Sequence, residues 1–535
     1  MSNFRHHLAI LAFGAATASV ATPAWADWRV VETEHFKYYS EAPADELLET
    51  VKRMETFDTL VRALTNNQKP SSPVKVTMFE VATMDDVNHT FPYPSEGVGG
   101  YYSSTTEGPF LVTFRNTLRT GMKSARKAAR QSYAWGPEVR QHEYLHHYMY
   151  QYFNANYPSW YSEGFAEYYG SMQFPEPNIV EIGHAPFFRV DTIRNGSWID
   201  ARELLTAKSY GDVNDVSALY AEGWLLTHLA AQNPERGTQL QMYLNSVASG
   251  TDYEQAAKQA FGNFDALNSD LKKHLKNINA MRLSLKPMEL GDFEVRDLSP
   301  VEDKLMRYQV RLYSGYEVSD LPQIISAVQA IRTEDPDNLM GLGIQAKLQN
   351  LDGKYADALA SSKRLLELDD NNVIGLTEKG KAMVGLLDSS ANEAAWEEAR
   401  APLLAAIEAS KTATEPRVAF FKSYLTQGIL PSVAAQNYMV QAFDLLPQND
   451  EIRYLVARDF EQRGMLDDAV AVIEPAAYGT FDGDEGKKRR RERLMKRFAE
   501  KYTNIQNYES PLEMLNRLRE KQGKTIEADP EVDSE

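Results

Sequence analysis

The sequence predicts an α+β fold in its amino-terminal half and an all-α fold in most of the remainder. Residues 28–33, 35–40 and 74–79 alternate apolar and polar side chains, as half-buried strands do. Residues 45–64 carry apolar side chains at helical spacing, and helical periodicity is nearly continuous from about residue 300. A chain of 535 residues is too long for one ordinary core, so we expect several domains.

The first 26 residues carry the features of a signal peptide. Arg5 precedes an apolar stretch, residues 8–21, which is too short to cross a bilayer. Small residues flank Trp25 in the pattern of a cleavage site, so we expect cleavage after Ala26. The chain has no cysteine, which excludes disulfides and a lipid-modified cysteine anchor. These features predict a protein that is periplasmic or secreted.

The net charge indicates which classes of molecule this protein is not expected to bind. The formal charge is −18, and a surface of this sign repels phosphate backbones and anionic lipid. We therefore expect neither nucleic acid nor a membrane surface as a partner. No later segment has the apolar length of a membrane span.

Residues 27–290 form the first predicted domain, with a small mixed sheet. Residues 99–102 and 110–114 read as strands, and the turn residues 106–109 between them predict a hairpin. Strand-like segments come first and long helices follow, which is typical of an α+β domain.

Residues 300–500 form the second predicted domain. The run of acidic and amide residues around Pro336 recurs 34 residues later, at 369–372, and a third copy opens at 447–450. This spacing resembles the tetratricopeptide repeat, and stacked repeats of that kind build a helical solenoid. A generic helical bundle is the alternative. Residues 507–535 are polar, and their composition predicts a disordered tail.

The residues that can carry chemistry are concentrated at positions 138–170. Residues 142–146 read H-E-x-x-H, and helical geometry places His142 and His146 on one face of a helix. Two imidazoles in that position can share one tetrahedral Zn²⁺. Glu143 would then reach the open coordination position as the general base.

A third ligand candidate follows His146 after a spacer of sixteen residues. Pro158 and Ser159 are well placed to begin a second helix, which carries Glu163. Folding back, this helix brings Glu163 near the histidines, and Gly164 allows the helices to approach closely. Glu167 lies one turn further along, where it can accept the second N–H of His142.

Residues 158–168, P-S-W-Y-S-E-G-F-A-E-Y, resemble the gluzincin metallopeptidases, in particular the bacterial peptidase MA-like domains. The resemblance implies a helical zincin-type catalytic domain with His142, His146 and Glu163 as zinc ligands and Glu143 as the base. The spacer is shorter than in the aminopeptidase branch, and the G-x-M-E-N motif is missing, so an endopeptidase or a processing enzyme suits the residues equally well.

The same resemblance points to a tyrosine that would donate a hydrogen bond to the oxyanion. Residues 218–226 are similar to the later helix of these domains, which makes Tyr220 the candidate and Tyr210 the second choice. His147 points away around the helix, so we expect it either in the outer shell of the metal site or on the surface. His184 reads as a solvated loop residue and His228 as a core residue.

We therefore expect an exported peptidase with one zinc ion per chain and a peptide or protein substrate. An extended peptide would lie along the edge strand of the hairpin. Two alternatives remain: a non-catalytic scaffold whose repeats bind a protein partner, and a zinc hydrolase of non-peptide bonds.

Overall fold

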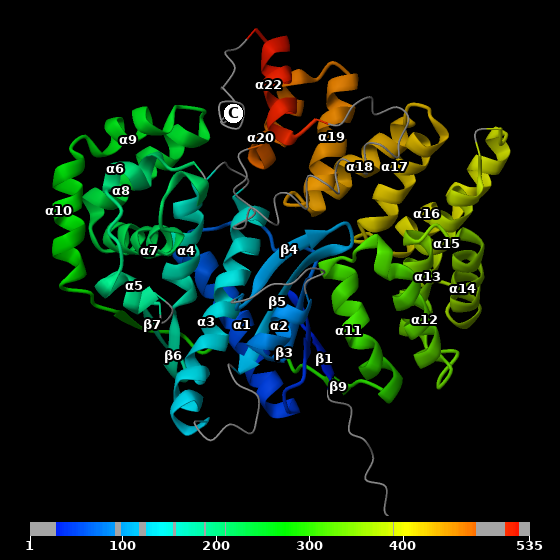
Figure 1. Cartoon of the computed structure of the whole chain (residues 1–535), viewed down its shortest axis with the longest axis horizontal. Coiled ribbons are helices and arrows are strands. Elements are labelled where there is room, and N and C mark those ends of the chain that lie inside the picture. The colour runs from blue at the N-terminus through cyan, green and yellow to red at the C-terminus, as the bar shows by residue number, and fades with distance from the viewer. Residues whose placement is uncertain are drawn as a thin grey trace, which may run out of the picture.

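The structure is a computed structural model that describes residues 28–90, 98–116, 125–153, 157–186, 189–208, 210–388, 390–477 and 509–523. The predicted signal peptide lies outside these residues. A six-stranded sheet stands at the centre of the molecule, with a lobe of helices on one side and an arc of paired helices on the other (Figure 1). No helix in the described ranges is long and apolar enough to cross a membrane.

The central sheet is mixed, with strand order β4-β5-β3-β2-β1-β9. Strand β3 pairs in parallel with β2 and β5, and the other neighbours are antiparallel. The strands are β1 (Arg29–Glu32), β2 (Phe36–Ser40), β3 (Val76–Thr83), β4 (Tyr101–Thr105), β5 (Gly108–Asn116) and β9 (Val295–Asp297). The predicted strands and hairpin are confirmed. Strand β9, just beyond the predicted first domain, was not predicted.

Both faces of the sheet are covered by other elements. Successive side chains of a strand point to opposite faces, so each strand contributes to two cores. Phe36, Tyr38 and Met78 point into the main core, which includes residues of α1 (Ala44–Leu64) and α3 (Ala125–Tyr152). Tyr39 and Phe79 point the other way, into a core shared with α11 (Pro300–Ser314). The first helix of the carboxyl-terminal region therefore packs directly on the sheet.

The helical lobe continues from α3. A small antiparallel sheet, β6-β7-β8, lies at its lower edge in Figure 1. Helix α2 (Met84–Thr90) is not part of this lobe and packs on strands β3 and β5 of the central sheet. The elements of the lobe after α3 are α4 (Ser159–Gly170), β6 (Gln173–Glu176), β7 (Ile179–Ile182), α5 (Val190–Asn195), α6 (Ala201–Thr206), η2 (Tyr210–Asp212), α7 (Val216–Gln232), α8 (Pro234–Ala248), α9 (Tyr253–Phe261), α10 (Phe264–Leu275) and β8 (Met281–Ser284).

The carboxyl-terminal region is a succession of helical pairs. Its recurring asparagines have a structural reason: Asn338, Asn372 and Asn449 each cap the helix that follows by accepting a hydrogen bond from a backbone N–H. After α11 the helices are η3 (Val318–Asp320), α12 (Leu321–Arg332), α13 (Leu339–Leu351), α14 (Tyr355–Leu368), α15 (Val373–Leu386), α16 (Glu393–Ala409), α17 (Glu415–Gln427), α18 (Val433–Leu445), α19 (Asp450–Gln462) and α20 (Leu466–Ala477).

The predicted disordered tail is wrong over one segment. Helix α22 (Pro511–Lys521) begins with a capping box between Ser510 and Glu513 and buries Met514, Leu515 and Leu518. These three side chains join the core of α19 and α20. The polar composition of the tail concealed an apolar stripe at helical spacing.

Candidate metal centre

Helix α3 presents two imidazoles side by side. His142 and His146 are one helical turn apart, and their Nε2 atoms lie 3.1 Å from each other. The centroids of the two rings lie 4.8 Å apart, and the ring planes stand at 80° to each other.

Glu163 of α4 completes the group. Its Oε2 lies 3.2 Å from Nε2 of His142 and 3.5 Å from Nε2 of His146. In a tetrahedral zinc site with ligand distances of ~2.0–2.1 Å, ligand atoms stand about 3.3–3.4 Å apart. The three atoms therefore have the spacing of three corners of that tetrahedron. Among the described residues, no other set of three or more His, Asp or Glu side chains has its ligand atoms close enough together to hold one metal ion.

The lack of a hydrogen-bond donor at one oxygen of Glu163 is also consistent with a bound cation. The side chain is buried, and its Oε2 has no well-formed hydrogen bond from any described residue. A buried carboxylate oxygen without a donor is costly unless a positive charge compensates it. The donor set, two imidazole nitrogens and one carboxylate oxygen, is one that Zn²⁺ accepts.

Electrostatics hold the cluster together without a metal. Burial raises the pKa of Glu163, but the imidazoles of His146 and His142 outweigh this effect and hold it well below its ordinary value. Burial lowers the pKa of His142, but the contact of its Nε2 with Glu163 at 3.2 Å and the charges of Glu167, Glu163 and Glu143 raise it to about 9.

The general-base candidate lies beside the chain that enters strand β4. Glu143 follows His142 on α3 and is half-buried. A β-carbon on Gly100 would lie 3.2 Å from Cγ of Glu143, so the chain entering β4 passes directly beside this side chain. The candidate base is next to the edge strand.

A tyrosine contacts the carboxylate candidate, but it is Tyr210 of η2. Its hydroxyl donates a hydrogen bond to Oε1 of Glu163. The first choice, Tyr220 of α7, stacks on His142, with ring centroids 6.5 Å apart and an interplanar angle of 16°. Burial raises the pKa of Tyr220 well above its ordinary value, so it stays a protonated donor. Both phenols lie at the site.

Glu167 has a different partner from the one expected. Its Oε1 accepts a hydrogen bond from Nε of Arg189 at 2.7 Å, and no hydrogen bond joins it to His142 among the described residues. The Arg189 guanidinium also lies over the ring of Tyr220, 4.1 Å from its centroid. Arg189 was not predicted, since a single arginine in a connecting segment gives no sequence signal.

The other histidines lie outside the group. Of the two positions expected for His147, the one on the surface is wrong: the side chain is buried between Tyr102 and Tyr144, and burial lowers its pKa to about 3. His184 pairs with Glu181 at 2.9 Å. His228 is a core residue, as predicted, and lies 2.7 Å from His274.

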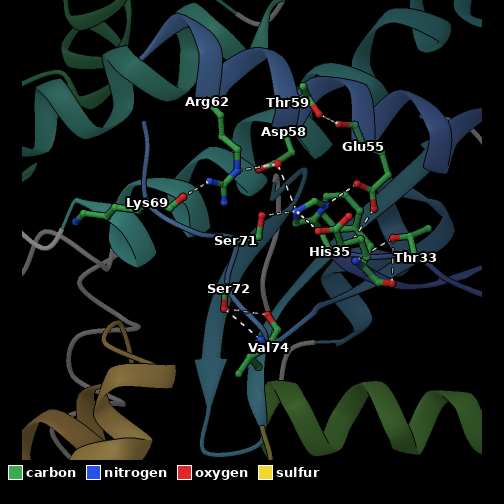
Figure 2. A network of polar contacts seen from close by, with 12 residues as sticks. Thr33, His35, Glu55, Asp58, Thr59, Arg62, Lys69, Ser71, Ser72 and Val74 are labelled. Carbon is green, nitrogen blue, oxygen red and sulfur yellow. Dashed lines mark hydrogen bonds and ion pairs between the residues drawn. The ribbon is translucent and has the colours of Figure 1, made fainter. Parts of the chain in front are cut away.

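A polar network fixes the opposite face of α3. The Tyr144 hydroxyl donates to Asp58 of α1, which also pairs with Arg62 at 2.9 Å. Figure 2 shows His35 in the same network, with its Nδ1 atom 2.6 Å from Glu55. Charged groups that are buried and paired in this way resist displacement. The network anchors the helix that carries the two imidazoles.

Comparison with models of known protein families gives no match, and comparison with curated proteins gives none either. Among solved structures, the chain is similar to a thermophilic TPR protein from Thermus thermophilus, with 21% sequence identity. That match covers 35% of this chain and 89% of the other, with a TM-score of 0.27. A superposition this loose supports no argument about function.

Proposed function

We propose that the protein is an exported zinc-dependent hydrolase of peptide bonds. The observation that carries the proposal is the mutual spacing of the three candidate ligand atoms, 3.1, 3.2 and 3.5 Å. One of these atoms is the buried Glu163 oxygen that has no well-formed hydrogen bond from a described residue. One zinc ion per chain would be held by His142, His146 and Glu163.

Glu143 is the proposed general base. Zinc at this site would supply Lewis acidity to a water molecule and to the scissile carbonyl. Glu143, adjacent to His142, would take the proton of the attacking water and return it to the leaving amine. The carboxylate lies beside the chain entering β4, where a substrate backbone would pass.

Two phenols are available for the oxyanion. Tyr210 is already engaged with Oε1 of Glu163, which assigns it to orienting that carboxylate. Tyr220 stacks on His142 and is the candidate donor to the developing negative charge. Arg189 would hold Tyr220 and Glu167 in place.

The sheet offers a surface for an extended substrate. Strand β4 is at the edge of the sheet, with β5 on its only paired side among the described strands. Edge strands bind extended peptides through main-chain hydrogen bonds. A complex with a substrate analogue bound away from β4 would contradict this part of the proposal.

Metal analysis of the purified protein tests the assignment. We expect about one equivalent of zinc in the wild type and its loss in His142→Ala and Glu163→Gln. His184→Ala is the matched control, since His184 pairs with Glu181 instead, and it should retain the metal. A wild-type protein that binds no zinc would favour the alternative of a non-catalytic scaffold, and zinc without peptide cleavage would favour a non-peptide substrate.

A further inference from the structure

The inner surface of the helical repeats is already in contact with another part of the chain. We define this surface by Lys347 of α13, Lys381 of α15, Glu415 of α17 and Asn449, which caps α19. Helix α15 packs against both α13 and α17, so these first helices of successive pairs form one layer. The β4–β5 hairpin points its turn into the arc of this layer (Figure 1).

An ion pair joins the turn of the hairpin to α13. Glu107 lies with its Oε2 2.5 Å from Nζ of Lys347. The lysine side chain is 8% exposed and the glutamate 30%. Glu107 is the carboxylate paired with this buried lysine, and a buried ammonium without a partner would be strongly destabilising.

A second contact holds Thr106, the other residue of the turn. Its hydroxyl donates to Glu415, and its carbonyl oxygen accepts a hydrogen bond of 2.5 Å from the Thr414 hydroxyl. Glu415 also lies 3.0 Å from Nζ of Lys381. Burial raises the pKa of Glu415, but Lys381 and Thr106 outweigh it and bring the value to about 2, so the carboxylate is charged.

Two further contacts follow β4 toward its start. The carbonyl oxygen of Ser104 accepts a hydrogen bond of 3.1 Å from Nδ2 of Asn449. The Tyr101 hydroxyl lies 2.6 Å from Oγ of Ser314, at the end of α11. Strand β4 is thus held at Ser104 by the repeats and at Tyr101 by α11, and the repeats also hold the turn that follows it.

The same strand reaches the candidate metal centre. Its approach passes Glu143 at Gly100, as described above. The Tyr102 ring lies 6.3 Å from the ring of Tyr150, which in turn stacks on His146 with centroids 6.0 Å apart. Contacts from the repeats therefore lead through β4 to the general-base candidate and to a ligand candidate.

From these contacts we infer that the repeats act as a clamp that positions β4, the substrate-binding edge strand, with Glu107, Lys347 and Glu415 as positioning residues. This inference rests on the proposed hydrolase function. A protein partner that occupied the inner surface would have to displace the hairpin, so it would act as an inhibitor rather than deliver substrate.

Charge reversal tests the clamp. Glu107→Lys and Lys347→Glu each place like charges at the contact, and the double variant restores an ion pair of opposite polarity. Glu107→Gln is a milder variant in case a reversal prevents folding. The matched control is the exposed pair Lys304 and Glu334, 2.6 Å apart and remote from the hairpin contacts, with the same exchanges.

Two readouts are needed on the intact protein. Hydrogen exchange of residues 101–114 reports whether the hairpin is held, and steady-state kinetics with an internally quenched extended peptide report KM and kcat. We expect each single reversal to accelerate exchange and raise KM about tenfold, with kcat and zinc content unchanged and both effects reversed in the double variant.

Each contrary result has a distinct meaning. Unchanged exchange in both reversals would overturn the clamp, and faster exchange with unchanged KM would overturn its role in substrate binding. If the wild type cleaves no peptide, the hydrolase proposal and the role of the clamp in substrate binding both fail. The exchange measurement still decides whether the repeats hold the hairpin.

Discussion

Gly164 of α4 and Gly223 of α7 meet at a helix crossing that admits no side chain. A β-carbon on Gly164 would lie 2.4 Å from the carbonyl oxygen of Gly223, and one on Gly223 would lie 2.4 Å from the carbonyl oxygen of Trp160. The expected partner of Gly164 was the helix bearing the two histidines, but the close approach is to α7. The crossing brings Tyr220 toward the helix of Glu163.

Substitution at this crossing should separate the two helices. We expect Gly223→Ala to destabilise the protein by about 1–3 kcal/mol or more, because a methyl group cannot fit against the backbone. Gly291→Ala is the control, since its β-carbon would meet only Phe293 at 3.8 Å. Urea unfolding measures both. Equal stability of the two variants would contradict the packing described.

The two tyrosines should have separable roles. Tyr210→Phe removes a hydrogen bond to Glu163, and loss of such a supporting contact lowers metal affinity by about 10–100-fold. Tyr220→Phe should leave zinc affinity nearly unchanged and lower kcat by about 10²–10³-fold, as for loss of an oxyanion donor. Zinc titration and peptide kinetics on both variants distinguish the roles. If Tyr210→Phe lowered kcat and Tyr220→Phe lowered zinc affinity instead, the two tyrosines would have the opposite roles.

The pair of Arg189 and Glu167 should be important for stability. Arg189→Met leaves the Glu167 carboxylate buried without its cation, and breaking such a pair costs about 3–5 kcal/mol. The exposed pair of Arg282 and Glu176 is the control, and Arg282→Met should have little effect on stability, because water screens the exposed charges. Thermal and urea unfolding should rank the two variants in that order; similar costs would mean that Glu167 has another partner.

Glu222 of α7 predicts a loss of stability in alkaline solution. Burial raises its pKa to about 8, against the opposing effect of Lys272. The folded state therefore binds this proton more tightly than the unfolded chain, whose pKa is near 4.5. The contribution of the protonated Glu222 carboxyl to the free energy of unfolding is fully present below pH 4.5 and is lost as the pH rises through 8.

Glu222→Gln removes this dependence. Relative to the wild type, the variant should gain a few kcal/mol of stability between pH 5 and pH 9, at about 1.4 kcal/mol for each unit of pKa shift. Urea unfolding at the two pH values measures the difference, with the exposed Glu203→Gln as control. Parallel curves for wild type and variant would show that Glu222 is ionised in the folded protein.

The sequence predicted the parts of the site that depend on local geometry. The four-residue spacing of His142 and His146 places both side chains on the same face of a helix. Pro158 marked the start of the helix that carries Glu163. The alternation of apolar residues predicted the strands, and the turn residues predicted the hairpin. Such signals lie within a few residues of the feature that they determine.

The parts that were missed depend on contacts between distant residues. Arg189 and Tyr210 come from connecting segments, where no periodicity indicates a direction. Glu107 and Lys347 are 240 residues apart, and Thr106 and Glu415 are 309 apart, so neither pairing can be predicted from the chain itself. The buried position of His147 likewise depends on Tyr102 of a separate strand.

Hydrolysis by Glu143→Gln tests the central claim most directly. The substitution keeps the shape of the side chain and removes the base, while the atoms proposed to bind zinc are untouched. We predict that the variant retains about one equivalent of zinc and loses peptide hydrolysis by about 10²-fold or more relative to wild type. Full activity in this variant, with zinc bound, would contradict the account.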